Sequence, residues 1–171
     1  MAAPNSMQSI RACSIHPTAK IMAFVNLYEC TIQAEAFIGP FVEIQRGAMV
    51  GKGTRVSSHT FICEGVTIGE NCFIGHGVMF TNDTYDTPMP NQGRYHLRET
   101  VVGNHVRIGS NVTLLPVTIG DHAIIGGGAV VTKDVPAGAV VAGNPAKVLR
   151  MRPQPQARVR AGRRATVRKS P

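Results

Sequence analysis

The sequence lacks the features that mark several large protein classes. Among its 171 residues there is no tryptophan, and aromatic residues make up only 5%. The first 13 residues contain no apolar core of signal-peptide length, and no run approaches the roughly 18 apolar residues that a membrane span needs. We therefore expect a soluble, cytoplasmic protein without a membrane span, long enough to bury a core of its own.

The four cysteines also lack a recognisable pattern. Cys13, Cys30, Cys63 and Cys72 form no C-x-x-C pair and no spacing typical of a zinc site. We interpret them as free thiols in a reducing compartment, and we expect no metal ion.

The excess of positive charge is confined to the C-terminal end. Residues 152–171 contain seven basic residues and no acidic one, whereas residues 1–151 contain 11 basic and 10 acidic residues. Because this segment is rich in Arg and Pro and shows no periodicity, we interpret it as a disordered basic tail. We expect a solvated appendage that does not bind nucleic acid; the alternative is a salt-dependent attraction to nucleic acid or an anionic membrane.

A bulky apolar residue returns every sixth position along most of the chain. A step of six is too long for a helix, and although it is a multiple of two, its strictness indicates strands that turn at regular intervals. Small or β-branched residues stand four places later, Thr31 and Thr118 among them, and Gly directly follows the apolar residue in eight hexads. The apolar positions number 18, of which 17 are Ile, Val or Leu: Ile15, Ile21, Leu27, Ile32, Ile38, Ile44, Val50, Val56, Ile62, Ile68, Ile74, Phe80, Val102, Ile108, Leu114, Ile119, Ile125 and Val131.

The irregular steps of this repeat indicate how many sides the coil has. The step shortens to five after Leu27 and after Leu114 and lengthens to 22 after Phe80, so every break falls between groups of three hexads. This pattern predicts a three-sided coil of about 18 residues, stacked at about 4.8 Å per coil. Proline cannot donate to a strand ladder and therefore marks corners; inside hexads it always stands two places after the apolar residue, at Pro17, Pro40 and Pro116.

The [Ile/Leu/Val]-Gly-x-x-x-x hexads of residues 14–150 resemble those of the hexapeptide-repeat acyltransferases. The resemblance implies an all-β left-handed parallel β-helix of about six three-sided coils, a hand that opposes the usual right-handed crossover. It also implies a homotrimer with active sites between subunits. The expected organisation is an N-terminal cap at 1–13, a β-helix at 14–135 with an inserted loop at 85–101, a short C-terminal cap at 136–151 and the tail at 152–171.

The segment GGGAVVTKDVPAGAVVAGNPAKVLR resembles the C-terminal end of coenzyme A-dependent members of this family, which carry A-G-x-P-A-[KR]. Its glycines let the backbone approach a ligand closely, and its cations suit a phosphate. The alternative is a solvated cap of the last coil. We predict that acetyl-CoA, as co-substrate, contacts Gly126, Gly127, Gly128, Gly143, Asn144, Lys147 and Arg150.

A second candidate region lies where the repeat is interrupted. Residues 85–101 contain two prolines and a glycine, which oppose regular structure, and a long excursion from a rigid scaffold is usually functional. The preceding FTND ends in Asn82 and Asp83, and stacking of the coils places Glu64 beneath Asn82, so that the three polar groups would meet. Plain hydrogen-bonded corner residues are the alternative. We expect an acceptor to be bound by Glu64, Tyr85, Arg94 and His96.

The run SHTFICEGVTI…GHGVMFTND resembles acetyltransferases that act on the amino group of nucleotide-linked amino sugars. This resemblance favours His59 as the catalytic base, with His76, Asn82 and Asp83 beside it, although each histidine also fits a solvent-facing or structural role. The five-residue histidine spacing of the γ-type carbonic anhydrases, which share this fold, is absent.

These observations predict an acetyltransferase that moves an acetyl group from acetyl-CoA to an amino sugar used in surface polysaccharide biosynthesis. The amine would attack the thioester carbonyl, hydrogen-bond donors would stabilise the oxyanion, and a base would remove the proton. The alternatives are O-acetylation of a sugar or other small hydroxyl acceptor, a non-catalytic β-helix scaffold, and a metalloenzyme of the carbonic anhydrase type.

Overall fold

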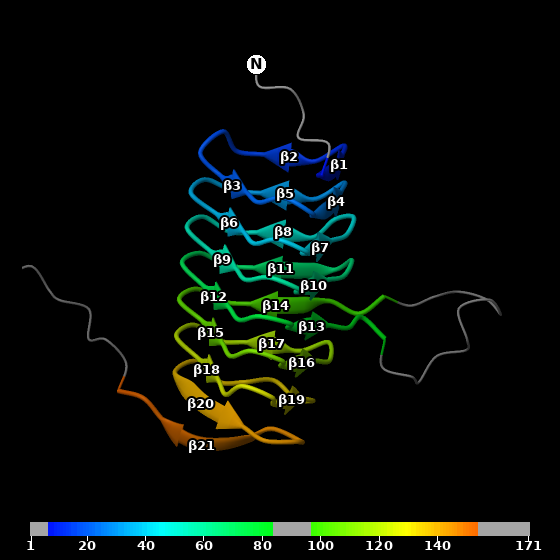
Figure 1. Cartoon of the computed structure of the whole chain (residues 1–171). Coiled ribbons are helices and arrows are strands. Elements are labelled where there is room, and N and C mark those ends of the chain that lie inside the picture. Colours follow the sequence, from blue (N-terminus) through cyan, green and yellow to red (C-terminus); the bar gives the residue numbers. More distant parts are fainter. Residues whose placement is uncertain (1–6, 84–96, 154–171) are drawn as a thin grey trace, which may run out of the picture.

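The computed structural model describes residues 7–83 and 97–153 of the 171-residue chain. These residues contain no helix; they form short strands, three to a turn, that stack into a tall prism (Figure 1). Strands one turn apart pair in parallel and build three sheets of seven, six and eight strands. The fold is the predicted all-β class, a left-handed parallel β-helix, with about one turn more than the six coils expected.

Each side of the prism is one sheet. Sheet A contains β1 (Ser9–Arg11), β4 (Asn26–Tyr28), β7 (Glu43–Ile44), β10 (Phe61–Ile62), β13 (Met79–Phe80), β16 (Thr113–Leu114) and β19 (Val130–Val131). Sheet B contains β2 (Ser14–Ile15), β5 (Thr31–Ile32), β8 (Met49–Val50), β11 (Val66–Ile68), β14 (Thr100–Val102) and β17 (Thr118–Ile119). Sheet C contains β3 (Lys20–Ile21), β6 (Phe37–Ile38), β9 (Arg55–Val56), β12 (Phe73–Ile74), β15 (Arg107–Ile108), β18 (Ile124–Ile125), β20 (Ala139–Ala142) and β21 (Lys147–Met151).

The apolar repeat forms the core of the prism. Sixteen of the 18 predicted positions are at most 1% exposed. The other two, Ile15 and Ile21, are half-buried because they belong to the first coil, where fewer neighbours cover them. Fully burying such a side chain is worth about 1.5–3 kcal/mol relative to leaving it exposed. A narrow stack of aliphatic side chains therefore stabilises the whole length of the prism.

Two of the small or β-branched positions of the repeat lie outside the core. The side chains of Thr31 and Thr118, each four places after an apolar residue, are exposed. In these two places the hexad is one residue short, so the preceding residue occupies the core position. Cys30 and Val117 are buried there, at 2% and 4% exposed. Pro17, Pro40 and Pro116 lie between strands, as expected of corner residues.

The two ends of the prism continue beyond the counted hexads. At the N-terminal end β1 pairs with β4, and at the C-terminal end β20 pairs in parallel with β18 and antiparallel with β21. Arg152 directly follows β21, and its N–H donates to the Gly138 carbonyl at 2.8 Å, so this residue still belongs to the ordered end. After the interruption of the repeat, β14 begins at Thr100, in register with Val66 of β11.

Candidate active site

The candidate histidines lie on one edge of the prism, where the chain turns from sheet C into sheet A. We call it the C–A edge; it comprises the corner residues that follow β9, β12, β15 and β18, and it ends at the turn that joins β20 to β21 within sheet C. Backbone hydrogen bonds stack these corners directly on one another. From the N-terminal end the edge carries Ser58 and His59, then His76 and Gly77, then Ser110 and Asn111, then Gly127 and Gly128. The edge thus joins the histidine pair to the glycine segment.

His76 is held between two serines of this edge. Its ring Nδ1 lies 2.8 Å from Ser58 Oγ, and its backbone N–H donates to Ser110 Oγ at 3.2 Å. The imidazole is exposed at the surface. When Nδ1–H donates to the Ser58 hydroxyl, Nε2 carries the lone pair that a general base needs. Sequence reasoning did not single out Ser58, although it stands 18 residues before His76, one full coil away.

His59 is supported by stacking instead. Its ring packs on Phe41 with centroids 4.9 Å apart, and Phe41 packs on Phe24 at 5.1 Å. The His59 backbone has a φ of 61° at the corner, and its side chain is exposed. No hydrogen bond to the His59 ring occurs within the described part of the chain. Both histidines of the predicted site therefore share the C–A edge, but His76 is the one whose ring nitrogen is fixed by a partner.

The other predicted polar residues lie on a different edge, where sheet A turns into sheet B. Asn82 Nδ2 donates to the Glu64 backbone carbonyl at 3.1 Å, which confirms that the two residues stack. The Glu64 carboxylate, expected beside the amide, instead accepts from Arg46 at 3.1 and 3.3 Å. Asp83 is half-buried next to Asn82. Sheet A thus separates this group from the histidines within one chain.

The glycines predicted to approach coenzyme A are required by the fold for two different structural reasons. A Cβ on Gly126 would lie 2.8 Å from the Ala142 Cβ, so this glycine is needed for the stacking of the coils. Gly128 has a φ of +70°, and no atom lies within 4 Å of the position that a Cβ would occupy. Gly143 and Asn144 are exposed in the turn between β20 and β21. Gly128, Gly143 and Asn144 are therefore exposed at the surface, although the Gly128 N–H already donates to the Ser110 carbonyl and the Gly143 carbonyl accepts from Val130.

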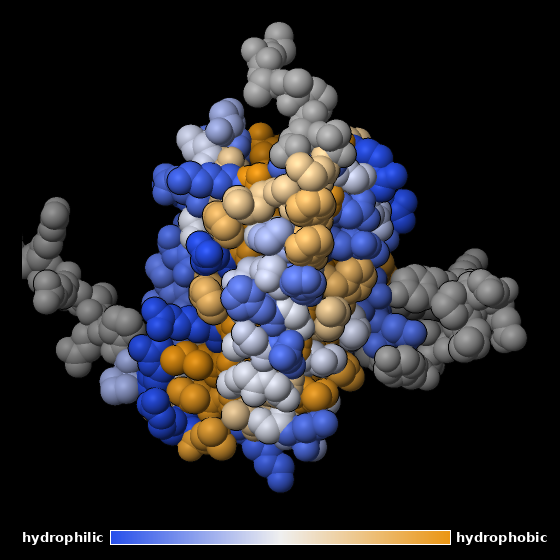
Figure 2. Space-filling model, in the orientation of Figure 1, coloured by the Kyte–Doolittle hydropathy of each residue, from blue (hydrophilic) through white to orange (hydrophobic). Residues whose placement is uncertain are grey.

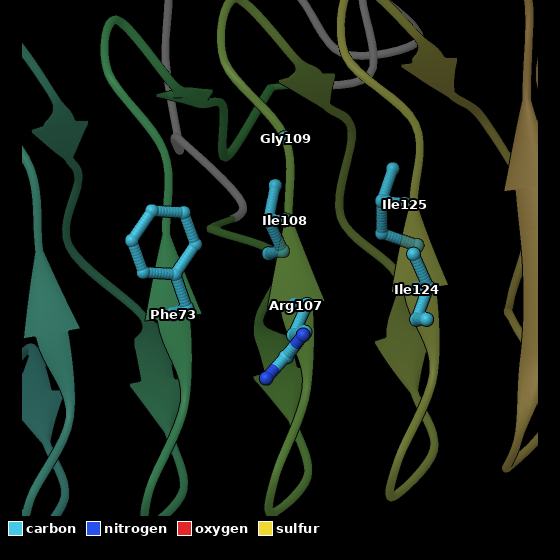
Figure 3. A pocket seen from close by; sticks show the side chains of 6 residues that line it. All are labelled: Phe73, Arg107, Ile108, Gly109, Ile124 and Ile125. Atoms are coloured by element: carbon cyan, nitrogen blue, oxygen red, sulfur yellow. The ribbon is translucent and has the colours of Figure 1, made fainter.

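A hollow of about 450 Å³ lies on sheet C beside the C–A edge. Its side chains come from β12, β15 and β18, and Figure 3 shows Phe73, Arg107 and Ile124 side by side on these strands. In the space-filling view, hydrophobic surface gathers near β18 and β20 (Figure 2). An apolar floor with one guanidinium suits a long, mostly uncharged chain that carries polar groups. The lining residues are Phe73, Arg107, Ile108, Gly109, Ile124 and Ile125.

A smaller hollow of about 260 Å³ lies at the C-terminal end of the prism. It combines valine side chains with Lys133 and Lys147, and the predicted cations Lys147 and Arg150 are both exposed on β21. The sequence analysis did not identify Lys133 of this smaller hollow, nor Phe73, Arg107 and Ile124 of the hollow on sheet C. The last three could have been found, because each directly precedes an aliphatic core residue and must therefore point outward from its strand.

The remaining predicted residues form no further site in the described part of the chain. Tyr85, Arg94 and His96 lie outside the described residues. His105 and His122 stack on the edge between sheets B and C with centroids 4.9 Å apart. Residues 7–83 and 97–153 contain no cluster of three His, Cys, Asp or Glu side chains able to hold a metal ion. They also contain no helix that is long and apolar enough to cross a membrane.

Comparison with known proteins also identifies a hexapeptide repeat in this chain. Residues 47–82 and 99–133 match the family described as bacterial transferase hexapeptide (six repeats). The bifunctional protein GlmU of Streptococcus mutans is 32% identical over 136 residues, which are 78% of this chain and 27% of the relative. The chain thus spans about a quarter of the length of this relative.

Solved structures share the same fold. A galactoside acetyltransferase in complex with coenzyme A is 30% identical, with a TM-score of 0.63 over 75% of this chain and 66% of the other. A hexapeptide transferase family protein from Anaplasma phagocytophilum is 23% identical, with a TM-score of 0.68 over 83% of this chain and 80% of the other. With its stacked hexads, three parallel sheets and these relatives, the chain belongs to the hexapeptide-repeat family of bacterial transferases.

Proposed function

We propose that the protein is an acetyl-CoA-dependent acetyltransferase that acetylates the amino group of a nucleotide-linked amino sugar in surface polysaccharide biosynthesis. The observation that carries this proposal is the C–A edge, which joins an oriented histidine to an apolar groove and a cationic end. The galactoside acetyltransferase that is 30% identical was solved with coenzyme A, which supports the same donor here. The choice of an amino sugar rests on the sequence resemblance around Asn82.

The dimensions of the edge suit a coenzyme A molecule. Three coil steps separate His76 from the Gly143 turn, which at about 4.8 Å per coil is a span of about 14 Å. We propose that the pantetheine arm lies along this span, against Phe73 and Ile124. Lys147 and Arg150 would then meet the phosphates with charge-assisted hydrogen bonds. This arrangement places the thioester at the histidine end of the groove.

The reaction needs a base near the thioester. A neutral amine attacks the thioester carbonyl, and the coenzyme supplies the activated acetyl group and departs as a thiol. We propose that His76 Nε2 accepts the amine proton, because Ser58 fixes its ring, with His59 one coil away as the other candidate. A positioned base typically contributes about 10²–10⁴-fold to rate. Asn82 and Asp83 are proposed to bind the acceptor.

Joining these groups requires more than one chain. Sheet A holds the histidines and Asn82 on opposite margins, so a complete site forms when the C–A edge of one subunit meets the Asn82 edge of its neighbour. We therefore propose a homotrimer with three sites between subunits, working in the cytoplasm where acetyl-CoA is made. Sedimentation should give three chains per particle. A stable monomer with full activity would contradict a shared site.

The substrate proposal is tested with a panel of nucleotide-linked amino sugars, acetyl-CoA and a colorimetric measurement of thiol release. At least one amino sugar should release thiol and gain an acetyl group on nitrogen, as seen by mass spectrometry. His76→Ala should lower kcat at least roughly a hundredfold while acetyl-CoA binding is kept. His59→Ala is the matched comparison on the same edge. If only His59→Ala is inactive, the base has been assigned to the wrong histidine.

O-acetylation of a sugar is the second candidate. It is favoured by the likeness to a galactoside acetyltransferase, since a galactoside offers hydroxyl groups as acceptors. A hydroxyl is a poorer nucleophile than a free amine and depends more strongly on the base. A panel in which only sugars without an amino group release thiol would select this function instead.

A further inference from the structure

Cys13 and Cys30 stack in consecutive coils at the entrance to sheet B. Cys13 directly precedes β2 and Cys30 directly precedes β5, and these strands pair in register through Ser14 and Thr31. The Ser14 N–H also donates to the Cys30 carbonyl at 2.9 Å. As a result the two sulfur atoms lie 3.6 Å apart, although 17 residues separate them in the sequence. The short hexad after Leu27 creates this pair by moving Cys30 into the core.

The backbone geometry at this pair suits a disulfide. Neighbouring strands are about 4.8 Å apart, so residues in register on them have Cα separations inside the range of about 4.4–6.8 Å found in disulfides. The two sulfur atoms need to approach by only about 1.5 Å to reach a bond of about 2.05 Å. Rotation about the two Cα–Cβ bonds supplies such a movement without separating the coils.

The two thiols differ in exposure. Cys13 is half-buried and reachable from solvent, whereas Cys30 is 2% exposed. Burial, with the nearby Cys13 thiol, raises the pKa of Cys30 to about 12, so Cys30 forms a thiolate less readily than a thiol with an ordinary pKa. Cys63 and Cys72 are both buried, and no other sulfur within bonding reach of either occurs in the described part of the chain. An external reagent therefore meets Cys13 first.

We propose that Cys13 and Cys30 are a modification site, at which a low-molecular-weight disulfide such as oxidised glutathione installs an intramolecular disulfide bond. Cys13 loses its proton and its sulfur attacks the reagent, whose S–S bond breaks and releases one thiol. Cys30 then loses its proton and attacks the Cys13 sulfur of the mixed disulfide, which releases the second thiol. The protein is oxidised by two electrons, and the reagent is reduced to two thiols.

The bond would link the first full coil to the second. Terminal repeats have neighbours on one side only, and the exposed strand β1 leaves the first coil thinly covered. A disulfide that closes a loop of this length restricts the unfolded chain. We expect the oxidised protein to melt several degrees higher than the reduced one.

The test uses the purified full-length protein, incubated with oxidised glutathione at pH 8 and then unfolded for thiol counting and peptide mapping. Two of the four thiols should disappear, a peptide pair joined through Cys13 and Cys30 should be found, and dithiothreitol should reverse both. Cys30→Ala should instead hold a glutathione adduct on Cys13, and Cys13→Ala should keep all its thiols. Cys63→Ala is the matched control and should still form the bridge.

Three results would overturn the proposal: four thiols surviving in the wild-type protein, a stable glutathione adduct without a bridge, or a disulfide between chains. The wild-type measurement decides the question even where a variant fails to fold. It also stands apart from the enzymatic proposal, since no turnover is measured.

Discussion

A methyl group added at Gly109 should destabilise the prism, because the coils touch at this corner. A Cβ there would lie 2.5 Å from the Gly127 nitrogen and 2.8 Å from its Cα, and neither backbone atom can rotate away. Overpacking of this kind costs about 1–3 kcal/mol. For a chain of this size, each kcal/mol lowers Tm by about 2–4 °C. We therefore expect Gly109→Ala to melt roughly 2–12 °C below the wild type.

Gly47→Asn is the matched control. Gly47 has a φ of +73° but no atom near the position of a Cβ, and Asn tolerates this backbone region well. We expect its Tm to stay within about 2 °C of the wild type. Thermal unfolding should be followed by circular dichroism at one protein concentration, since assembly shifts Tm. Equal stability of Gly109→Ala and wild type, or a larger loss in Gly47→Asn, would refute the close stacking at this corner.

Three further outcomes are expected. Lys147→Ala combined with Arg150→Ala should raise the KM for acetyl-CoA at least threefold and leave the acceptor KM unchanged in steady-state assays; a reversed pattern places the coenzyme elsewhere. Removing residues 154–171 should leave Tm and kcat unchanged, because the ordered end closes at Arg152, and a drop of many degrees would show that the tail packs. Burial raises the pKa values of Cys30 and Cys63 to about 12 and 11. As pH rises, these thiols ionise in the unfolded chain before they ionise in the folded protein, so Tm should fall between about pH 8.5 and pH 10.5. The fall should be less steep in Cys63→Ala, which has one buried thiol fewer. If the Tm of Cys63→Ala and of the wild type fell in parallel, ionisation of Cys63 would not be the cause.

The fold was largely predictable because it is repetitive. Each hexad places one bulky apolar side chain inward, and 18 such positions leave little choice of architecture. The irregular hexads were harder to interpret. A missing residue after Leu27 shifts the next inward position from Thr31 to Cys30, and this depends on where the corner tightens rather than on residue type. The thiol pair of Cys13 and Cys30 follows from that shift and from the pairing register, which the cysteine spacing alone does not reveal.

The candidate site was predictable in position but not in contacts. Counting hexads places Glu64 beneath Asn82, and the structure confirms that stacking. The direction of a long side chain could not be predicted in this way. The Glu64 carboxylate turns toward Arg46, because the opposite charge of Arg46 lies one coil away. Likewise, the sequence shows only that Ser58 and His76 stand one coil apart, and it does not show the hydrogen bond between the Ser58 hydroxyl and the His76 ring.

The central claim is that acetyl-CoA lies along the C–A edge, and calorimetric titration of two charge insertions tests it most directly. Ile124→Glu places a carboxylate in the groove, where it would remove apolar contact and repel the coenzyme phosphates. Val101→Glu places the same charge on sheet B, at a residue that is 41% exposed and remote from the groove. With the oligomeric state of both variants verified by light scattering, we predict that Ile124→Glu raises the Kd for acetyl-CoA at least tenfold and that Val101→Glu leaves it within twofold of the wild type. Equal affinities in the two variants, or a loss confined to Val101→Glu, would contradict the placement of the coenzyme on this edge.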